Sequence, residues 1–464
     1  MPRVVLLCVA LLCMVLPGDM PARAREAQAR YVFLFIGDGM GVNQVATAAY
    51  LRGEMEGEDR SEALSGLSFT GFSALGLMST HSWDSPVTDS AAAITAMASG
   101  QKARNETLNL DPESGEALVP VSCLARDAGY AIGVITSASL DHATPAGFYA
   151  STDDRYDYAE IAQQGLDRRI MDFWAGGGFQ RDEDALVEQA LDMGYRVVDT
   201  PQDIRELQGG DEPVIALAPA STKAVPPYMA YEIDRLRAAQ YGGEDISLRE
   251  LVEAGIRVLS PQPFFLVCEA AKVDTACSTY DAVTAAYEVL ALDDAVQAAL
   301  EFAQEHPQDT LIVVLADHET GSLQITYGAD YDGFAMQIAS AARFEGILEE
   351  LYEQGASWEQ LLEQVEHYFG IAADQMSQEE LSALGAAYAA GYAGQIAPLY
   401  QGIEPVVYQV MQMVGERVGV KVNTVSHSGQ PVAVYAQGAG AELFQGVYDN
   451  TRVFQSLKAV MGLQ

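Results

Sequence analysis

The stretch Tyr31-Val-Phe-Leu-Phe-Ile36 runs directly into Gly37-Asp38-Gly39-Met40-Gly41. An uninterrupted apolar run of this length is typical of a strand buried on both faces, as in parallel sheets covered by helices. The glycines are spaced G-x-G-x-G, which differs from the G-x-G-x-x-G of dinucleotide-binding turns. Asp38 is therefore the informative residue of this turn, and we expect a helix after it, from about Asn43 to Leu51.

Three more apolar runs of this kind follow, at residues 131–137, 263–268 and 310–316. Helix-like stretches separate them, and this alternation is the rhythm of βαβ units. The sequence therefore predicts an α/β fold, a three-layer αβα sandwich with a mainly parallel central sheet. After the first of these runs, Pro145 is expected to hold Thr144 in an extended conformation.

The character of the chain changes in its last third. Residues 321–422 have a mainly helical pattern, in which Ser357 and Ser377 each begin a capping box. A strand pattern returns at 432–436. We therefore expect residues 25–464 to form one α/β domain, with 321–422 as a mainly helical insertion.

The first 24 residues have the pattern of a secretory signal peptide. Arg3 provides the positive start, residues 4–16 the apolar segment, and Ala22-Arg23-Ala24 an A-x-A cleavage site. The apolar segment is too short to span a bilayer, and no later stretch is long enough. The sequence thus predicts an exported protein, periplasmic or extracellular, without a membrane anchor.

The composition favours some partners and excludes others. The 464 residues are 49% hydrophobic and carry a formal net charge of -39. Nucleic acids and anionic membranes require basic surfaces, so neither is expected as a partner, whereas cations are favoured. Cleavage after Ala24 would leave Cys123, Cys268 and Cys277, which allow at most one disulfide.

The segment Thr88-Asp89-Ser90 precedes a run of strong helix formers that reaches Ala98, and Gly100 is a plausible helix end. Thr88 and Asp89 are good capping residues, so Ser90 is expected in the first turn. Free backbone N–H groups and the helix dipole make that turn a site for an anion such as phosphate. The same local pattern also fits an ordinary helix-capping cluster. The positions of the acids and histidines therefore have to decide whether Ser90 is functional.

Three of the predicted strands end at a carboxylate, namely Asp38, Glu269 and Asp317. The carboxyl ends of parallel strands meet at one edge of the sheet, so these acids should converge. Clustered carboxylates repel one another unless cations neutralise them. With His318 and His427 expected nearby, the ligand set suits zinc or magnesium.

These motifs resemble those of the alkaline phosphatase family, in the family's order and over nearly the whole chain. The matching segments are Phe35–Gly41, Val87–Ala92, Ala143–Ala146, Val267–Glu269 with Val273-Asp274, Ala316–His318, and His427 ahead of Asp449-Asn450-Thr451. The resemblance implies hydrolysis of phosphate monoesters on small phosphorylated substrates. It makes Ser90 the nucleophile that forms a phosphoserine, and Arg155 the residue that grips two phosphate oxygens.

The resemblance also implies two zinc ions and one magnesium ion. The implied ligands are Asp38, Asp317 and His318 for the first zinc, Asp274 and His427 for the second, and Asp38, Thr144 and Glu269 for magnesium. A pair of metal ions can stabilise both the entering and the departing oxygen of an in-line displacement.

The chain departs from the family pattern at the second zinc site. The family has His four residues after the position of Asp274, and this chain has Ser278, a far poorer zinc ligand. Cys277 is an alternative thiolate ligand, although a small residue packing inward explains it as well. His142 stands where the family has Asp or His, and is expected to act through water near the magnesium.

Two alternatives follow from this departure and from the fold. One is hydrolysis of phosphodiesters or sulfate esters on the same scaffold. The other is a catalytically weak protein that binds metal or phosphate. The family's usual dimer implies a homodimer here.

Overall fold

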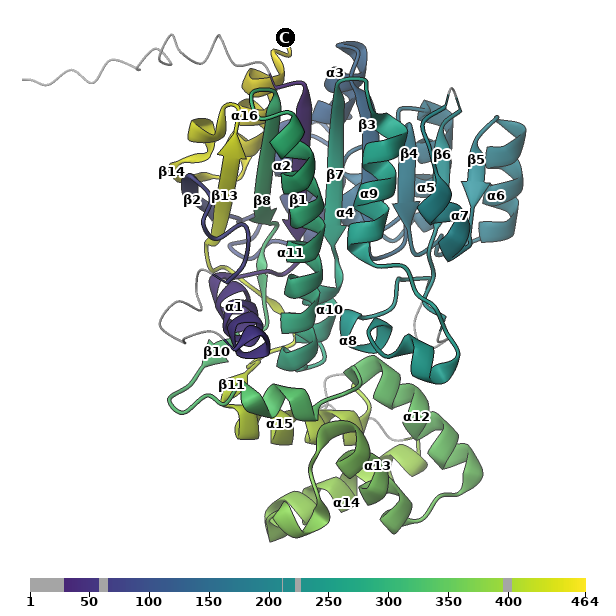
Figure 1. Ribbon diagram of the computed structural model, residues 1–464, viewed down its shortest axis with the longest axis vertical. Coiled ribbons are helices and arrows are strands. Elements are labelled where there is room, and N and C mark those ends of the chain that lie inside the picture. The colour runs from purple at the N-terminus through teal and green to yellow at the C-terminus, as the bar shows by residue number, and fades with distance from the viewer. Residues whose placement is uncertain (1–28, 58–65, 211, 222–226, 395–402) are drawn as a thin grey trace, which may run out of the picture.

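A ten-stranded, mainly parallel sheet forms the middle of the protein in a computed structural model (Figure 1). The structure describes residues 29–57, 66–210, 212–221, 227–394 and 403–464, and the expected signal peptide, residues 1–24, lies outside them. In order across the sheet, the strands are β14 (Gly446–Asp449), β2 (Ala74–Ser79), β13 (Val432–Gly438), β8 (Thr310–Ala316), β1 (Tyr31–Gly37), β7 (Phe264–Ala270), β3 (Ala131–Thr136), β4 (Phe173–Gly176), β6 (Val214–Leu217) and β5 (Arg196–Val198). β13 runs antiparallel to β2 and β8, and the other paired strands are parallel.

The first apolar run of the sequence becomes β1, near the centre of this sheet. All seven of its residues are buried, and it pairs in parallel with β7 on one side and β8 on the other. Its side chains are apolar on both faces because helices cover both faces. The predicted α/β sandwich with a mainly parallel sheet is confirmed.

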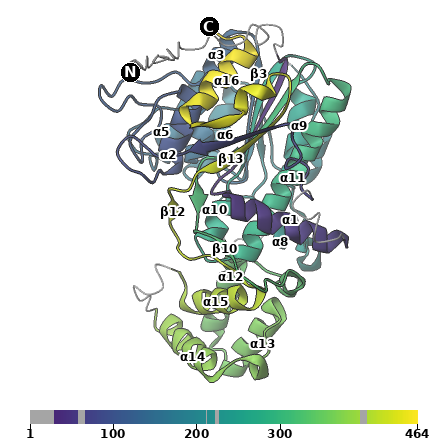
Figure 2. The same cartoon turned by 90° about the vertical axis from the view of Figure 1, so that its left-hand side faces the viewer.

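Helices form the two outer layers (Figure 2). On one face lie α9 (Leu248–Leu259) and the long α11 (Ala282–Glu305), and on the other lie α2 (Ser90–Ser99), α3 (Val121–Asp127) and α16 (Thr451–Met461). The remaining helices of this part are α1 (Val42–Glu56), α4 (Ala143–Ala146), α5 (Tyr158–Arg168), α6 (Glu183–Asp192), α7 (Pro201–Glu206), α8 (Glu232–Arg235) and α10 (Lys272–Cys277).

A group of helices lies beyond the end of the sheet that β7 and β8 reach with their carboxyl termini (Figure 1). It comprises α12 (Ala341–Gln354), α13 (Trp358–Phe369), α14 (Gln378–Tyr392) and α15 (Pro405–Val418). The capping boxes predicted at Ser357 and Ser377 are confirmed at the starts of α13 and α14. The side chains of Asp234 and Asp281 accept hydrogen bonds from Ser340 and Gln337, which joins this group to the α/β part.

Two short two-stranded sheets lie between the α/β part and the helical group. β10 (Gln324–Ile325) pairs with β11 (Val420–Lys421), and β12 (His427–Ser428) pairs with β9 (Glu319–Thr320). The second pair sets His427 opposite Thr320, close behind the end of β8. Within the described part of the chain no helix is long and apolar enough to cross a membrane, and Cys123, Cys268 and Cys277 are free thiols.

Candidate active site

Three carboxylates meet at the carboxyl ends of the central strands. Asp38 follows β1, and its backbone N–H donates to the carbonyl of Ala270 at 3.1 Å, while Asp317 directly follows β8. Glu269 was expected just after a strand but lies inside β7, because this strand continues to Ala270 in register with Gly37. All three side chains are buried.

These carboxylates have no compensating protein partner for much of their charge. Asp38 Oδ1, Glu269 Oε1 and Asp317 Oδ2 are buried without a hydrogen bond. Burial raises the pKa of Asp38 well above its usual value, and the charges of Asp317 and Asp274 raise it further. Burial likewise raises the pKa of Asp317 to about 6 and that of Glu269 to about 7. Buried oxygens in this state are suited to binding cations.

The imidazole of His318 turns one ring nitrogen toward this cluster. Its Nε2 lies 3.4 Å from Asp38 Oδ1 and 3.3 Å from Asp317 Oδ2. Its Nδ1 lies 3.3 Å from Thr320 Oγ1, whose own proton is donated to Asp274. The threonine oxygen therefore accepts from Nδ1–H, which leaves the Nε2 lone pair free to bind a metal. Asp38, Asp317 and His318 form one group of potential ligands.

A second group lies beside the first and consists of Asp274, His427 and again His318. Asp274 sits on α10 and His427 on β12, where His427 Nδ1 donates to the carbonyl of Thr88 at 2.9 Å. His427 Nε2 therefore faces Asp274 Oδ1, 3.4 Å away. The rings of His318 and His427 stack with their centroids 3.6 Å apart. Although burial lowers the pKa of His427, the neighbouring Asp274 carboxylate outweighs it and raises this pKa to about 9.

Neither sequence candidate for a further ligand of this second group is free in the structure. Ser278 lies one helical turn after Asp274 and donates its hydroxyl proton to the carbonyl of Val425 at 3.1 Å. Cys277 is buried, receives a weak contact from Gln44 Nε2 at 3.8 Å, and has a thiol pKa raised well above its usual value by burial. Among the described residues, no group of His, Cys, Asp and Glu side chains that could hold a metal ion includes Cys277.

The third group contains Asp38, Glu269 and His142, which places a nitrogen of His142 close to both carboxylates. Thr144 is fully buried nearby, and its Oγ1 has no hydrogen-bond partner. The expected extended conformation of Thr144 is wrong, because Ala143–Ala146 form the short helix α4. Proline is tolerated there since the N–H groups of a first turn have no partner within the helix.

Ser90 begins α2, as the sequence predicts, with Asp89 as its N-cap and Gly100 as its left-handed C-cap. Asp89 Oδ1 accepts from the N–H of Ala92 at 2.9 Å, while its Oδ2 binds Arg155 Nη1 at 2.9 Å. Ser90 Oγ lies 3.2 Å from His318 Nε2. The Ser90 hydroxyl, the first ligand group and the buried guanidinium of Arg155 therefore lie close together.

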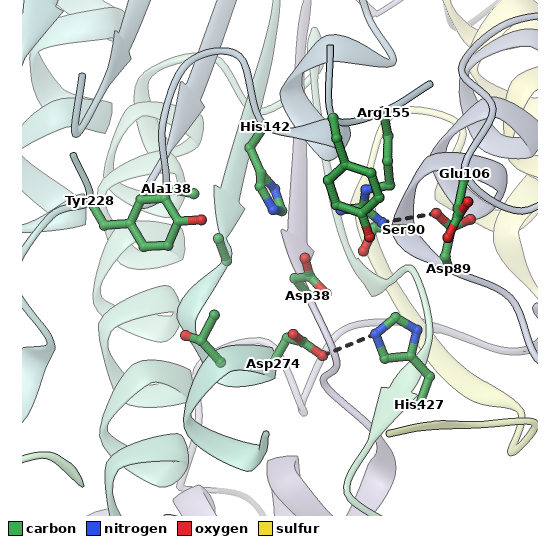
Figure 3. A pocket seen from close by; sticks show the side chains of 13 residues that line it. Asp38, Asp89, Ser90, Glu106, Ala138, His142, Arg155, Tyr228, Asp274 and His427 are labelled. Atoms are coloured by element: carbon green, nitrogen blue, oxygen red, sulfur yellow. Dashed lines mark hydrogen bonds and ion pairs between the residues drawn. The ribbon is translucent and has the colours of Figure 1, made fainter. Parts of the chain in front are cut away.

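A cavity of about 220 Å³ opens over these groups (Figure 3). Its walls are formed by Asp38, Asp89, Ser90, Glu106, Ala138, His142, Arg155, Tyr156, Tyr228, Ala271, Asp274, Thr275 and His427. Figure 3 shows Ser90 and Asp89 on one side, Tyr228 and Ala138 on the other, and Asp38 between them. The cavity is large enough for a phosphate group and part of its alcohol.

Sequence reasoning missed two residues that organise this site. Asp89 was interpreted as a helix cap alone, and no local pattern connects it to Arg155, which is 66 positions away. Thr320 joins His318 to Asp274, and its only sequence signal is its place just behind Asp317-His318. Both links depend on how separate segments fold together, which spacing along the chain does not reveal.

Comparisons with known proteins find relatives that match nearly the whole chain. The family profile described as Alkaline phosphatase matches residues 29–176 and 172–463. Alkaline phosphatase 3 of Bacillus subtilis (strain 168) is 28% identical over 448 residues, which cover 94% of this chain and 89% of that protein. The Thermus thermophilus alkaline phosphatase crystal structure superposes with a TM-score of 0.79 at 27% identity, covering 95% and 93% of the two chains. A cold-active alkaline phosphatase from a psychrophilic Shewanella sp. gives 0.78 at 26% identity, covering 93% and 99%.

Proposed function

Because the chain belongs to the alkaline phosphatase family, whose members hydrolyse phosphate monoesters, we propose that Ser90 is its nucleophile and Arg155 its phosphate-binding residue. The observation that carries this proposal is the 3.2 Å approach of Ser90 Oγ to His318 Nε2, beside two unpaired buried carboxylate oxygens. The family and fold do not favour the alternatives of phosphodiester or sulfate ester hydrolysis.

The first and third ligand groups fit metal ions, since Asp38 Oδ1, Asp317 Oδ2 and Glu269 Oε1 are buried without a hydrogen-bond partner. We assign the first zinc to Asp38, Asp317 and His318, the second to Asp274 and His427, and magnesium to Asp38, Thr144 and Glu269, with His142 nearby. When bound, these ions supply Lewis acidity that lowers the pKa of the Ser90 hydroxyl and of water and stabilises the leaving oxygen.

The residues of the chain position both steps. Arg155 binds Asp89 through Nη1, so its remaining N–H groups are free to hold phosphate oxygens. Ser90 Oγ gives up its proton to solvent and attacks phosphorus, the bond to the alcohol oxygen breaks, and the departing alkoxide takes up a proton to leave as the alcohol, while the phosphoryl group becomes an ester of Ser90. Water then displaces Ser90, which takes up a proton, and inorganic phosphate is released. Each displacement inverts at phosphorus, so the configuration is retained overall.

The second metal site is weaker than the first, because with His318 assigned to the first zinc it keeps two ligands, Asp274 and His427, against three. Zinc sites in proteins use three or four protein ligands. We therefore propose a slow or differently metallated phosphatase rather than a silent binding protein, since the first group and Ser90 are complete.

The nucleophile is tested by Ser90→Ala, with Ser99→Ala at the other end of α2 as the matched control. Ser99 only donates to the carbonyl of Thr95. We expect Ser90→Ala to lose p-nitrophenyl phosphate hydrolysis by at least about 10³-fold, while Ser99→Ala stays active. Mass spectrometry after an acid quench should find one phosphoryl group on Ser90 in the unmutated protein. Full activity in Ser90→Ala would remove Ser90 from the reaction.

The same family membership supports three broader proposals. Residues 25–464 form the catalytic domain with 321–422 as a helical insertion. The protein is exported to the periplasm or the extracellular space, and it works as a homodimer. Fractionation of the expressing cells and the mass of the purified protein in solution test the last two.

A further inference from the structure

The mouth of the cavity is marked by the two lining residues that are exposed, Glu106 and Tyr156. Tyr156 is 57% exposed, whereas Ser90 and Arg155 are buried behind it. Figure 3 shows Glu106 on the side of the cavity where Ser90 and Asp89 lie. A part of a substrate that extends out of the cavity on this side passes near the Glu106 side chain.

Glu106 is held in place by an uncommon backbone conformation. Its φ is 68°, in the left-handed region that residues with side chains rarely adopt. Its carbonyl accepts a hydrogen bond from the N–H of Arg155 at 2.9 Å, which ties this turn to the phosphate-binding residue. A strained residue at the mouth of a functional cavity calls for a functional explanation.

The charge of Glu106 is not balanced by a neighbour. The guanidinium of Arg155 is paired with Asp89 at 2.9 Å, and no ion pair or hydrogen bond among the described residues uses the Glu106 carboxylate. The ring of Tyr156 lines the same cavity, 5.6 Å from Arg155 Cζ. A free carboxylate next to an aromatic ring attracts ammonium groups and repels carboxylates.

We propose that Glu106 is a specificity-determining residue that ranks phosphate monoesters by the charge of their alcohol. Alcohols with an ammonium group are preferred over neutral ones, and alcohols with a carboxylate are disfavoured. This inference rests on the proposed function, because it assumes that phosphate is held between Ser90 and Arg155. Glu106 does not touch the reacting atoms, so it changes the relative kcat/KM of substrates and leaves the chemistry in place.

The test compares three small substrates on the metal-loaded protein: phosphoethanolamine, glycerol 3-phosphate and 3-phosphoglycerate. The last two differ mainly by a hydroxymethyl group in place of a carboxylate. In Glu106→Gln, kcat/KM for 3-phosphoglycerate relative to glycerol 3-phosphate should rise about three- to fivefold, the range of one partly screened charge pair. The ratio for phosphoethanolamine should fall by a similar factor. Both changes should vanish near 1 M salt, where the screening length is about 3 Å.

Two further variants separate charge from shape and position. Glu106→Gly removes the charge together with the strained φ, and it should change the ratios as Glu106→Gln does. Glu113→Gln removes an exposed charge from the same segment outside the cavity lining, and it should change neither ratio. Equal effects on all three substrates, or a change that persists at high salt, would overturn the proposal. If the unmutated protein and Ser90→Ala hydrolyse the substrates equally, the proposed function itself fails.

Discussion

The two zinc-ligand groups of this site differ in how they are built. The first group, Asp38, Asp317 and His318, stands at the ends of two central strands, and its side chains are at most 2% exposed. The second group adds Asp274 and His427, which come from a short helix and a two-residue strand and keep 19% and 23% of their side chains exposed. Both groups include His318, so with that imidazole assigned to the first zinc the second group keeps two ligands.

The difference also appears in the charges. In the first group, burial and the neighbouring carboxylates raise the pKa of Asp38, and the opposing charge of Arg155 is too weak to offset them. In the second group, burial opposes ionisation of Asp274, but the hydrogen bond and charge of His427 win and lower its pKa. The first group therefore suits a metal ion, and its unbalanced negative charge lowers the stability of the metal-free protein. In the second group, the charges of Asp274 and His427 balance each other without a metal ion.

Replacing one acid from each group should give effects of opposite sign in the metal-free protein. Asp317→Asn should stabilise it at pH 8 by about 1–3 kcal/mol, because the folded state raises the pKa of Asp317 to about 6 and so disfavours its charge. This gain should vanish below about pH 4, where the carboxyl is protonated in both states. Asp274→Asn should instead destabilise the protein, because it removes the negative charge that faces His427 Nε2, an interaction that lowers the pKa of Asp274 in the folded state. Thermal unfolding after chelation measures both.

Once zinc is added, the substitution that stabilises the metal-free protein should become harmful. Asp317→Asn should lose hydrolysis by more than about 100-fold, since a lost ligand costs more than a lost outer contact. It should also lose most of the rise in melting temperature that zinc gives the unmutated protein. If Asp317→Asn and Asp274→Asn both stabilise the metal-free protein, the two groups do not differ in their electrostatics as described here.

The strand ends explain how much of this contrast could be predicted from the sequence. The apolar runs before Asp38 and Asp317 indicate a parallel sheet, and a parallel sheet brings the carboxyl ends of its strands together, so the first group could be predicted from local pattern. The second group depends on His427, whose position follows from the pairing of β12 with β9 across a long helical segment. No local pattern predicts that pairing, and the resemblance to the family supplied it. The short helix at Thr144 differs from the expectation because the preference of the residue before proline for an extended conformation is a tendency, and the fold overrides it here.

Ser278→His should make the second group resemble the first. Ser278 is four residues after Asp274, and its N–H donates to the carbonyl of Asp274, so the two side chains leave the same face of α10. An imidazole at this position supplies a third ligand that is not shared. We expect the affinity of the second site for zinc to rise about 10- to 100-fold, measured as zinc retained per chain against a competing chelator.

Thr279→His is the matched control for this gain, because Thr279 follows Ser278 at a position that points elsewhere on the helix and bonds only to nearby carbonyls. It should retain no additional zinc. If Ser278→His also leaves zinc retention unchanged, then Ser278 is not the gap in the second group.

The smallest expected effect tests the contact that connects the two groups, Thr320. Its hydroxyl donates to Asp274 and accepts from His318, so it orients one ligand of each group. Thr320→Val keeps the shape of the side chain but removes both hydrogen bonds, and an outer contact of this kind is worth about tenfold in metal affinity. Thr320→Ser keeps the hydroxyl and should restore most of that loss. Because His318 serves both groups, Thr320→Val should weaken both zinc sites together, and loss from the second site alone would show that the link orients only Asp274.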